Sequence, residues 1–281
     1  MRIPKGNQFM MLSSFFVALI SLGVKLLSHI PAVEILFFNS LGALLISFTM
    51  LRYRRLTIWS KNSNLLLVRG VVGTLGVILY FFTLQHIPLP SAMTLHNTAP
   101  IFSAIIGIFM IKEPVSPRQW LFFGLSFVGI VLINGFSLTA TSWYVCSGLA
   151  GAFFRGLANS IIRKIERKED PLVVTFYAYL VTVPTTGAYL LYHFVDLQAQ
   201  DWMVLSAISL LGYVAHYYAV KAYQLGPLAP VAATAYMAVI YALLFSYLFL
   251  DESLPHLKLL GLGLVLLGVL LSVFLRPKQT I

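Results

Sequence analysis

The sequence predicts an all-α integral membrane protein with ten transmembrane helices, arranged as two inverted five-helix repeats. Composition, the spacing of apolar segments and an internal repeat lead to this prediction. Hydrophobic residues make up 59% of the 281 residues and charged residues 10%, whereas soluble domains carry about 25% charged residues. A soluble protein this apolar would expose large apolar patches and aggregate, so a lipid bilayer is the solvent that fits the composition.

Apolar segments of spanning length recur along the whole chain, separated by Pro, Asn, Asp or charged residues. A helix needs about 20 residues to cross the hydrocarbon. The expected spans are roughly 9–29, 33–52, 64–85, 90–111, 117–134, 142–164, 171–193, 202–224, 229–250 and 256–275. The first has no clear cleavage site, so we expect it to remain as a helix. The connections are short, which predicts antiparallel neighbours and leaves no room for a soluble catalytic domain.

Basic residues predict the orientation. If the N-terminus is cytoplasmic, 14 of the 19 Lys and Arg residues fall on the cytoplasmic side and only Lys258 falls on the opposite side. Membrane proteins keep Lys and Arg in their cytoplasmic loops, so both termini are expected in the cytoplasm. This asymmetry explains the net charge of +10 without a nucleic-acid partner. The short loops fit a multi-pass protein of the bacterial inner membrane.

The two halves of the chain align without a gap at a shift of 139 positions. The residues that coincide are Pro88-Leu89 with Pro227-Leu228, Glu113 with Glu252, Gly124 with Gly263, and Gly129 with Gly268. We therefore expect one five-helix repeat in residues 1–137 and a second in 138–281. Because five is odd, tandem copies must lie in opposite orientations. Inverted repeats build secondary transporters, which bind substrate near the midplane where the repeats meet.

Several short segments carry a family resemblance. They are Pro88-Leu89-Pro90-Ser91-Ala92, Asn97-Thr98-Ala99-Pro100, Lys112-Glu113-Pro114, Gly226-Pro227-Leu228-Ala229 and Leu250-Asp251-Glu252-Ser253. In this order they resemble the EamA family of the drug/metabolite transporter superfamily, and some relatives resemble S-adenosylmethionine carriers. The resemblance implies ten helices, cytoplasmic termini and a central cavity. It also implies transport of amino acids, metabolites, nucleotide-linked compounds or drugs.

Arg155 is the strongest candidate for a substrate contact. It lies near the middle of the sixth expected span, between Phe154 and Gly156, too deep for its guanidinium to reach the headgroups. Such a charge must pair internally or line a wet cavity. A guanidinium binds carboxylate or phosphate well, so the small-molecule substrate could be anionic or zwitterionic. The alternative is a structural ion pair or hydrogen bonds to backbone carbonyls.

Other polar residues fall at similar depths and complete the predicted site. They are Tyr80, His96, Asn97, His216, Tyr217 and Tyr236. Asn97 and Tyr236 coincide under the repeat, and Pro100 frees a carbonyl in the fourth expected span, as in the broken helices around many substrate sites. A cavity with these groups could hold a polar, partly aromatic metabolite. Each Tyr alone is more often a packing residue or an interface anchor.

Three charged residues near span ends are candidates for coupling or gating. The side chains of Lys25 and Arg69 are long enough to extend to the headgroups, which is the preferred interpretation. Glu34 is the only acid inside an expected span and lies near its outer end. It could be solvated, pair with Lys25 or take up a proton during transport.

Two other functions compete with a carrier. A membrane-embedded enzyme would need a catalytic cluster, but the sequence has no H-E-x-x-H motif, no Gly-rich phosphate loop and no intramembrane acidic pair. A channel or scaffold would favour a continuous polar stripe, whereas the polar residues here are scattered over several spans. The sequence therefore predicts a transporter rather than an enzyme, with no cofactor or metal, as a monomer or homodimer.

Overall fold

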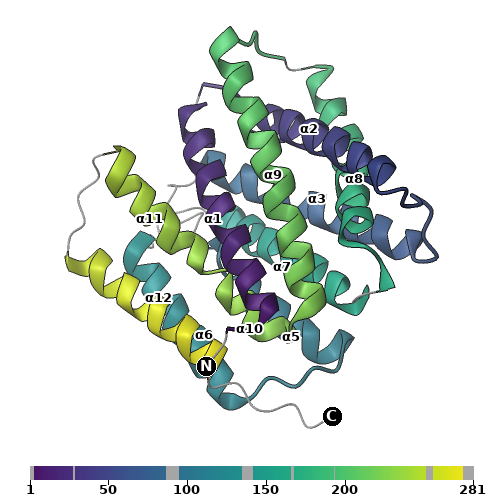
Figure 1. Ribbon diagram of the computed structural model, residues 1–281. Coiled ribbons are helices and arrows are strands. Elements are labelled where there is room, and N and C mark those ends of the chain that lie inside the picture. The colour runs from purple at the N-terminus through teal and green to yellow at the C-terminus, as the bar shows by residue number, and fades with distance from the viewer. Residues whose placement is uncertain are drawn as a thin grey trace.

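A computed structural model describes residues 3–27, 29–86, 95–134, 142–165, 168–192, 194–250 and 256–274. The regular secondary structure in these ranges consists of helices joined by turns and short loops. No strand occurs in these ranges. The helices, drawn in Figure 1, are α1 (Lys5–Leu26), α2 (Ala32–Tyr53), α3 (Ser63–His86), α5 (Ala99–Met110), α6 (Pro117–Asn134), α7 (Ser142–Ile165), α8 (Pro171–Leu190), α9 (Ala199–Leu225), α10 (Leu228–Thr234), α11 (Met237–Leu250) and α12 (His256–Phe274).

Six of these helices are long and apolar enough to cross a membrane, namely α1, α2, α3, α7, α8 and α9. Shorter apolar stretches occupy 99–110, 117–132, 228–241 and 259–272. This all-helical, apolar architecture is that of an integral membrane protein. The ninth expected span is interrupted, because α10 and α11 are separated by a turn at Ala235 and Tyr236. Residues 87–94, which include the start of the fourth expected span, lie outside the described residues.

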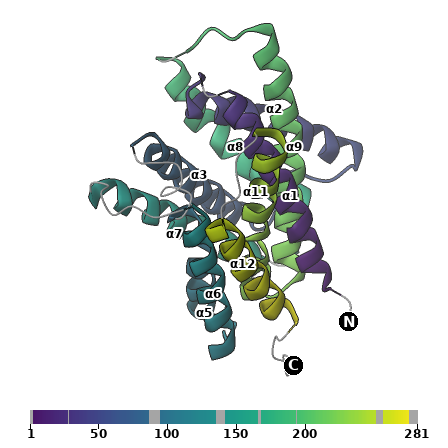
Figure 2. The same cartoon turned by 90° about the vertical axis from the view of Figure 1, so that its left-hand side faces the viewer.

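Helix contacts exchange between the two halves of the chain. Helix α1 packs on α9 as α7 packs on α3, and α2 packs on α9 as α8 packs on α3. Helix α11 packs on α1 as α5 packs on α7, while α2 contacts α8 and α6 contacts α12. Figure 2 shows α3 and α7 running side by side, away from the group that contains α1 and α9. Each of these contacts therefore has a counterpart in which the helices of the two halves swap places, or is its own counterpart.

The contact between α6 and α12 shows this exchange at residue level. A Cβ atom at Gly129 would lie 2.6 Å from the carbonyl oxygen of Gly261. At the corresponding Gly268, it would lie 2.8 Å from the carbonyl oxygen of Phe122. Only glycine allows backbones to approach this closely. Gly124, which has open space around its Cβ position, is not part of this contact.

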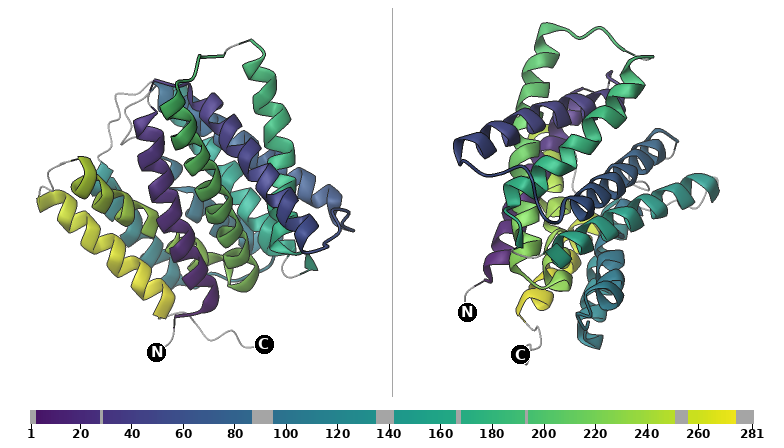
Figure 3. Two further views of the ribbon diagram at one scale, coloured as in Figure 1. Left: turned by 45° about the horizontal axis from the view of Figure 1, so that its top comes forward. Right: turned by 90° about the vertical axis from the view of Figure 1, so that its right-hand side faces the viewer.

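The largest apolar core lies at one end of the molecule. It joins the starts of α1, α3, α8 and α10 to the ends of α2, α7 and α9, through residues such as Met10, Leu51, Leu66, Ile162 and Val220. The start of α1 and the end of α12 lie at this same end (Figure 3), which we call the terminal end. Among the described residues, the opposite end has two smaller, separate clusters, one around Leu27 and Leu205 and one around Leu95.

Candidate functional site

A cavity of about 370 Å³ lies between the two groups of helices. The described residues around it come from α1, α2, α3, α5, α7, α8, α9, α11, the segment before α5 and the turn between α10 and α11, and none comes from α6 or α12. Its polar lining residues are Ser13, Ser14, Asn39, Ser40, Arg69, Thr74, His96, Asn97, Arg155, Asn159, Tyr179, Thr182, His216, Tyr223 and Tyr236. The cavity has the volume of a small-molecule site.

Helical periodicity explains why these side chains converge. On α3, Arg69, Gly73 and Val77 recur every four residues, and all three line the cavity. On α7, Arg155 and Asn159 have the same spacing. Side chains four residues apart lie on one helix face, so each of these helices presents one face to the cavity, with its arginine on that face.

Arg155 lies where the sequence predicts it, on the cavity wall. Arg155 lines the cavity and is exposed. No carboxylate among the described residues forms an ion pair with it; the ion pairs there join other residues. The alternative of a structural salt bridge is therefore not supported within the described chain.

Arg69 differs from the prediction. The expectation that it extends to the headgroups is wrong, because only 6% of it is exposed and it lines the cavity. One terminal guanidinium nitrogen, Nη2, lies 2.9 Å from His216 Nε2, which it can donate to, while its Nε has no partner. A neutral imidazole accepts this hydrogen bond without cancelling the charge, so Arg69 brings a second positive charge to the cavity.

His96, Asn97 and Tyr236 also line the cavity, as predicted. The His96 ring stacks on that of Tyr80 with centroids 3.9 Å apart, so Tyr80 supports a lining residue without being one itself. Tyr236 occupies the turn between α10 and α11 and is 1% exposed, and its hydroxyl has no partner. Asn97 lies in the turn just before α5. Asn97 and Tyr236 therefore both lie where helical structure is interrupted.

The remaining predicted residues lie away from the cavity. Tyr217 is not in its wall; its ring stacks on Tyr213 and lies 5.7 Å from the Lys221 ammonium. Glu34 is fully buried rather than solvated, and its Oε2 accepts a hydrogen bond of 3.3 Å from the Val195 backbone N–H. The Lys25 side chain lies outside the described residues.

Sequence comparison assigns the chain to a family. Residues 4–135 and 142–274 each match the EamA-like transporter family. The chain belongs to the EamA-like transporter family. It is therefore a membrane transporter and not an enzyme.

Individual relatives of this transporter have different named substrates. The chain is 27% identical to the pseudopaline exporter CntI of Pseudomonas aeruginosa, covering 96% of this chain and 94% of the relative. It is 26% identical to human solute carrier family 35 member G1, covering 88% and 73%. It is 18% identical to the S-adenosylmethionine uptake transporter of Rickettsia prowazekii, covering 92% and 87%. A protein of known crystal structure shares the fold, with a TM-score of 0.83 and 14% identity over 96% of both chains.

Unpartnered polar atoms gather around the transporter's cavity. Among the described residues, ten buried side-chain atoms have no hydrogen-bond partner, and five of these belong to cavity-lining residues: Asn39 Oδ1, Ser40 Oγ, Arg69 Nε, His96 Nδ1 and Tyr236 Oη. Buried polar groups are normally satisfied because leaving one unpaired costs about 1–3 kcal/mol. Such a concentration of unsatisfied groups marks a surface that a ligand or water completes.

Sequence analysis missed several lining residues. Asn39, Asn159 and Tyr179 lie in the cavity wall, and Tyr179 donates a hydrogen bond of 3.1 Å to the Gly212 carbonyl. The four-residue spacing from Arg155 could have identified Asn159. No comparable sequence signal points to Tyr179, because the packing of α8 against α9 determines which face of α8 lines the cavity.

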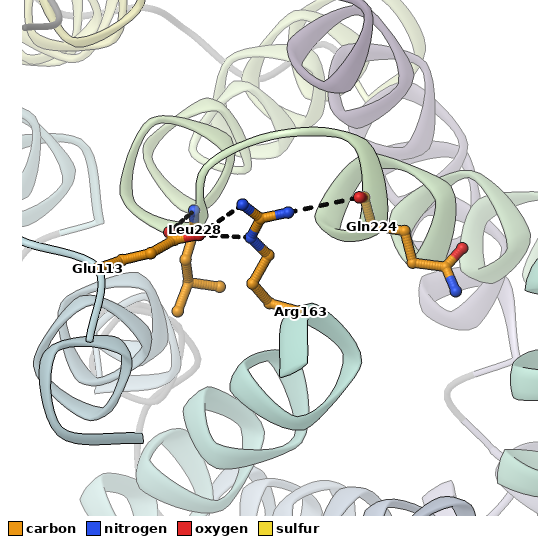
Figure 4. Close-up of polar contacts among 4 residues, drawn as sticks. All are labelled: Glu113, Arg163, Gln224 and Leu228. Carbon is orange, nitrogen blue, oxygen red and sulfur yellow. Dashed lines mark hydrogen bonds and ion pairs between the residues drawn. The ribbon is translucent and has the colours of Figure 1, made fainter. Parts of the chain in front are cut away.

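A polar cluster fastens helix ends at the terminal end. Figure 4 shows Glu113 after α5, Arg163 near the end of α7, Gln224 near the end of α9 and Leu228 at the start of α10. Arg163 Nε and Nη2 lie 2.6 and 2.5 Å from Glu113 Oε1. Glu113 Oε2 accepts a 2.8 Å hydrogen bond from the Leu228 N–H, and Arg163 Nη1 donates to the Gln224 carbonyl over 3.4 Å. We call these four residues the Glu113 cluster.

Proposed function

We propose that this protein is a secondary transporter that moves a small polar metabolite by alternating access, with the substrate bound in the cavity described above. The observation that carries the proposal is the cavity wall. Helices from both halves form it, and its buried polar atoms lack partners. A carrier needs such a site near mid-membrane, where two halves can expose it alternately to either side.

Ten spans in two inverted repeats, residues 1–137 and 138–281, are part of this proposal. Three observations support it: the family matches the chain twice in succession, helix contacts exchange between the halves, and Gly129 and Gly268 make corresponding contacts. With five spans in each half, the repeats have opposite orientations in the membrane. The halves can then exchange conformations, which moves the opening of the cavity from one side to the other.

The proposed conformation is closed at the terminal end. The largest apolar core and the Glu113 cluster both lie there and join helices of both halves. The described residues at the other end form separate clusters. We infer that the terminal end is cytoplasmic, because 14 of the 19 basic residues fall on that side of the expected spans. A bacterial inner membrane suits this orientation, and bacterial relatives support it.

Roles within the site follow from position. Arg155 and Arg69 would bind acidic groups of the substrate, and Asn97, His216 and Tyr236 would supply hydrogen bonds. His96, stacked on Tyr80, would present a flat surface to an unsaturated substrate. Coupling or gating by Glu34, Lys25 and Arg69 is part of the proposal; Arg69 lines the cavity, and Glu34 is not among the described lining residues.

Counterflow in proteoliposomes tests the proposed function. A carrier should give saturable uptake of labelled solute. Unlabelled solute on the other side should accelerate this uptake, because the carrier can then return in its loaded form instead of empty. Arg155→Gln should remove most of this flux, whereas Lys164→Gln should retain it, since Lys164 is exposed at the terminal end. Flux that never saturates would indicate a channel and would contradict the proposal.

A further inference from the structure

The cavity carries two positive charges and no described negative one. Arg69 and Arg155 are the only Lys or Arg residues among its described lining residues, and that lining contains no Asp or Glu. Glu34 lies on α2, one of the helices that line the cavity, but it is not a lining residue. Its carboxylate accepts a hydrogen bond from the Val195 backbone N–H instead. An uncompensated charge at membrane depth is expensive and is retained where it serves function.

Hydrogen-bonding capacity is biased in the same direction. Arg155 donates to no described residue, Arg69 keeps a free Nε–H, and the Tyr236 and Ser40 hydroxyls are unpartnered. Guanidinium groups donate and never accept. Of the other unpartnered lining atoms, Asn39 Oδ1 can only accept, whereas His96 Nδ1 and the two hydroxyls can donate or accept. The two fixed charges are therefore donors alone, and a ligand that binds them must bring acceptor oxygens and negative charge.

The backbone positions that carry the two arginines are separated along the cavity. A Cβ at Gly76 on α3 would lie 3.1 Å from the Arg155 backbone nitrogen on α7, so these two positions are level. Arg69 precedes Gly76 by seven residues, which is about 10 Å along the helix axis. Two acid groups on one flexible small molecule can bind at these two positions better than a single compact anion can.

We propose that the substrate is a small organic dianion, with one acid group bound by Arg155 and the other by Arg69 beside His216. This inference rests on the proposed function, because it specifies what occupies the transport cavity. Carboxylate and phosphate share the required chemistry, since both accept paired hydrogen bonds from a guanidinium. A dianion would neutralise the cavity when the protein closes around it, whereas the empty cavity would retain two charges away from water. Exchange of substrate across the membrane should therefore be faster than net flux.

A binding panel on the full-length protein in detergent tests this proposal. The probes are linear dicarboxylates of increasing length, the monomethyl and dimethyl esters of each, sugar and glycerol phosphates, and diamines of matched length. A ligand that binds the folded protein raises Tm according to its concentration relative to Kd. We expect at least one dicarboxylate or phosphate to bind at least about tenfold more tightly than its less charged or neutral analogue. The dicarboxylate and phosphate arms separate the two chemistries.

Two variants make the test specific. Arg155→Gln should weaken binding of that dianion at least about tenfold without lowering ligand-free Tm, since Arg155 bonds to no described residue. Asn159→Asp, one turn away on the same face of α7, should weaken it by placing a negative charge in the wall. Lys164→Gln is the matched control and should bind as wild type.

The outcomes separate this proposal from the proposed function. Preferential binding of neutral or cationic probes, absence of any dianion effect at about 10 mM, or unchanged dianion binding by both variants would overturn the dianion. Saturable counterflow of a neutral solute would leave the carrier standing and remove the dianion. Specific dianion binding without counterflow would support the ligand class and remove the carrier.

Discussion

Breaking the Glu113 cluster should shift the transporter towards the state that is open at the terminal end. Arg163→Gln removes both contacts to Glu113 Oε1 and the hydrogen bond to the Gln224 carbonyl, but leaves Glu113 Oε2 free to accept from the Leu228 N–H. The α10 start therefore keeps its hydrogen bond, and only the link to α7 is lost. The adjacent Lys164 is exposed, so Lys164→Gln makes the same chemical change without removing a described contact.

The magnitude follows from how buried the pair is. Both side chains are 16% exposed, so the pair is intermediate between surface and fully buried ion pairs. Surface pairs contribute about 0–1 kcal/mol to stability, and breaking a buried pair costs about 3–5 kcal/mol. A value of about 2 kcal/mol corresponds to a factor of about 30 in an equilibrium constant. If the pair exists only in the closed state, Arg163→Gln should change the ratio of the two states by about that factor.

Cysteine accessibility measures this shift. Cys146 is the single cysteine of the chain and is exposed, so the reporter is Ala158→Cys in a Cys146→Ser background. Ala158 lines the cavity. A membrane-impermeant maleimide, added from the terminal side of oriented vesicles, should label this cysteine up to about 30-fold faster in Arg163→Gln. Equal labelling rates in Arg163→Gln, Lys164→Gln and the parent would show that the Arg163–Glu113 pair does not hold the terminal end closed.

Three further predictions concern packing and the cavity wall. Gly129→Ala should lower the free energy of unfolding by about 1–3 kcal/mol, since its Cβ would meet the Gly261 carbonyl; Gly124→Ala, with open space, should leave Tm unchanged or higher. Tyr236→Phe should not lower Tm, because its buried hydroxyl has no partner, but should raise KM for transport; a drop in Tm with KM unchanged would show that the hydroxyl is structural. Asn7→Ala should lower the free energy of unfolding by about 1–3 kcal/mol, because the fully buried Asn7 amide donates to the Pro230 carbonyl and Thr234 Oγ1 at 3.0 and 2.7 Å. An equal loss in Gln8→Ala, at an exposed residue, would contradict a specific contribution of these two hydrogen bonds.

Sequence periodicity predicted the helices well because apolar length is a direct consequence of bilayer thickness. The sequence also predicted that Arg155 lines a cavity, because a charged side chain in the middle of an apolar span must pair internally or face a wet cavity. It could not separate His216 from Tyr217. Neighbouring residues on a helix point about 100° apart, so only His216 faces the cavity while Tyr217 packs on Tyr213.

Tertiary partners were beyond the reach of the sequence. Arg163 looked like one of many cytoplasmic charges, yet it contacts Glu113 fifty positions away. Arg69 looked able to reach the headgroups because it lies near the start of a span, but packing of α3 turns it into the cavity beside His216. In both cases the deciding contact joins helices whose adjacency the sequence does not specify.

Distances at the two ends of the cavity test alternating access most directly. In a Cys146→Ser background, spin labels replace Lys5 on α1 and Lys164 on α7 at the terminal end, or Trp143 on α7 and Trp202 on α9 at the other end; all four residues are exposed. When substrate is added to the protein in membranes, alternating access predicts that the distance at one end lengthens while the distance at the other end shortens. Distances that stay fixed at both ends during measurable transport, or that lengthen together, would contradict it.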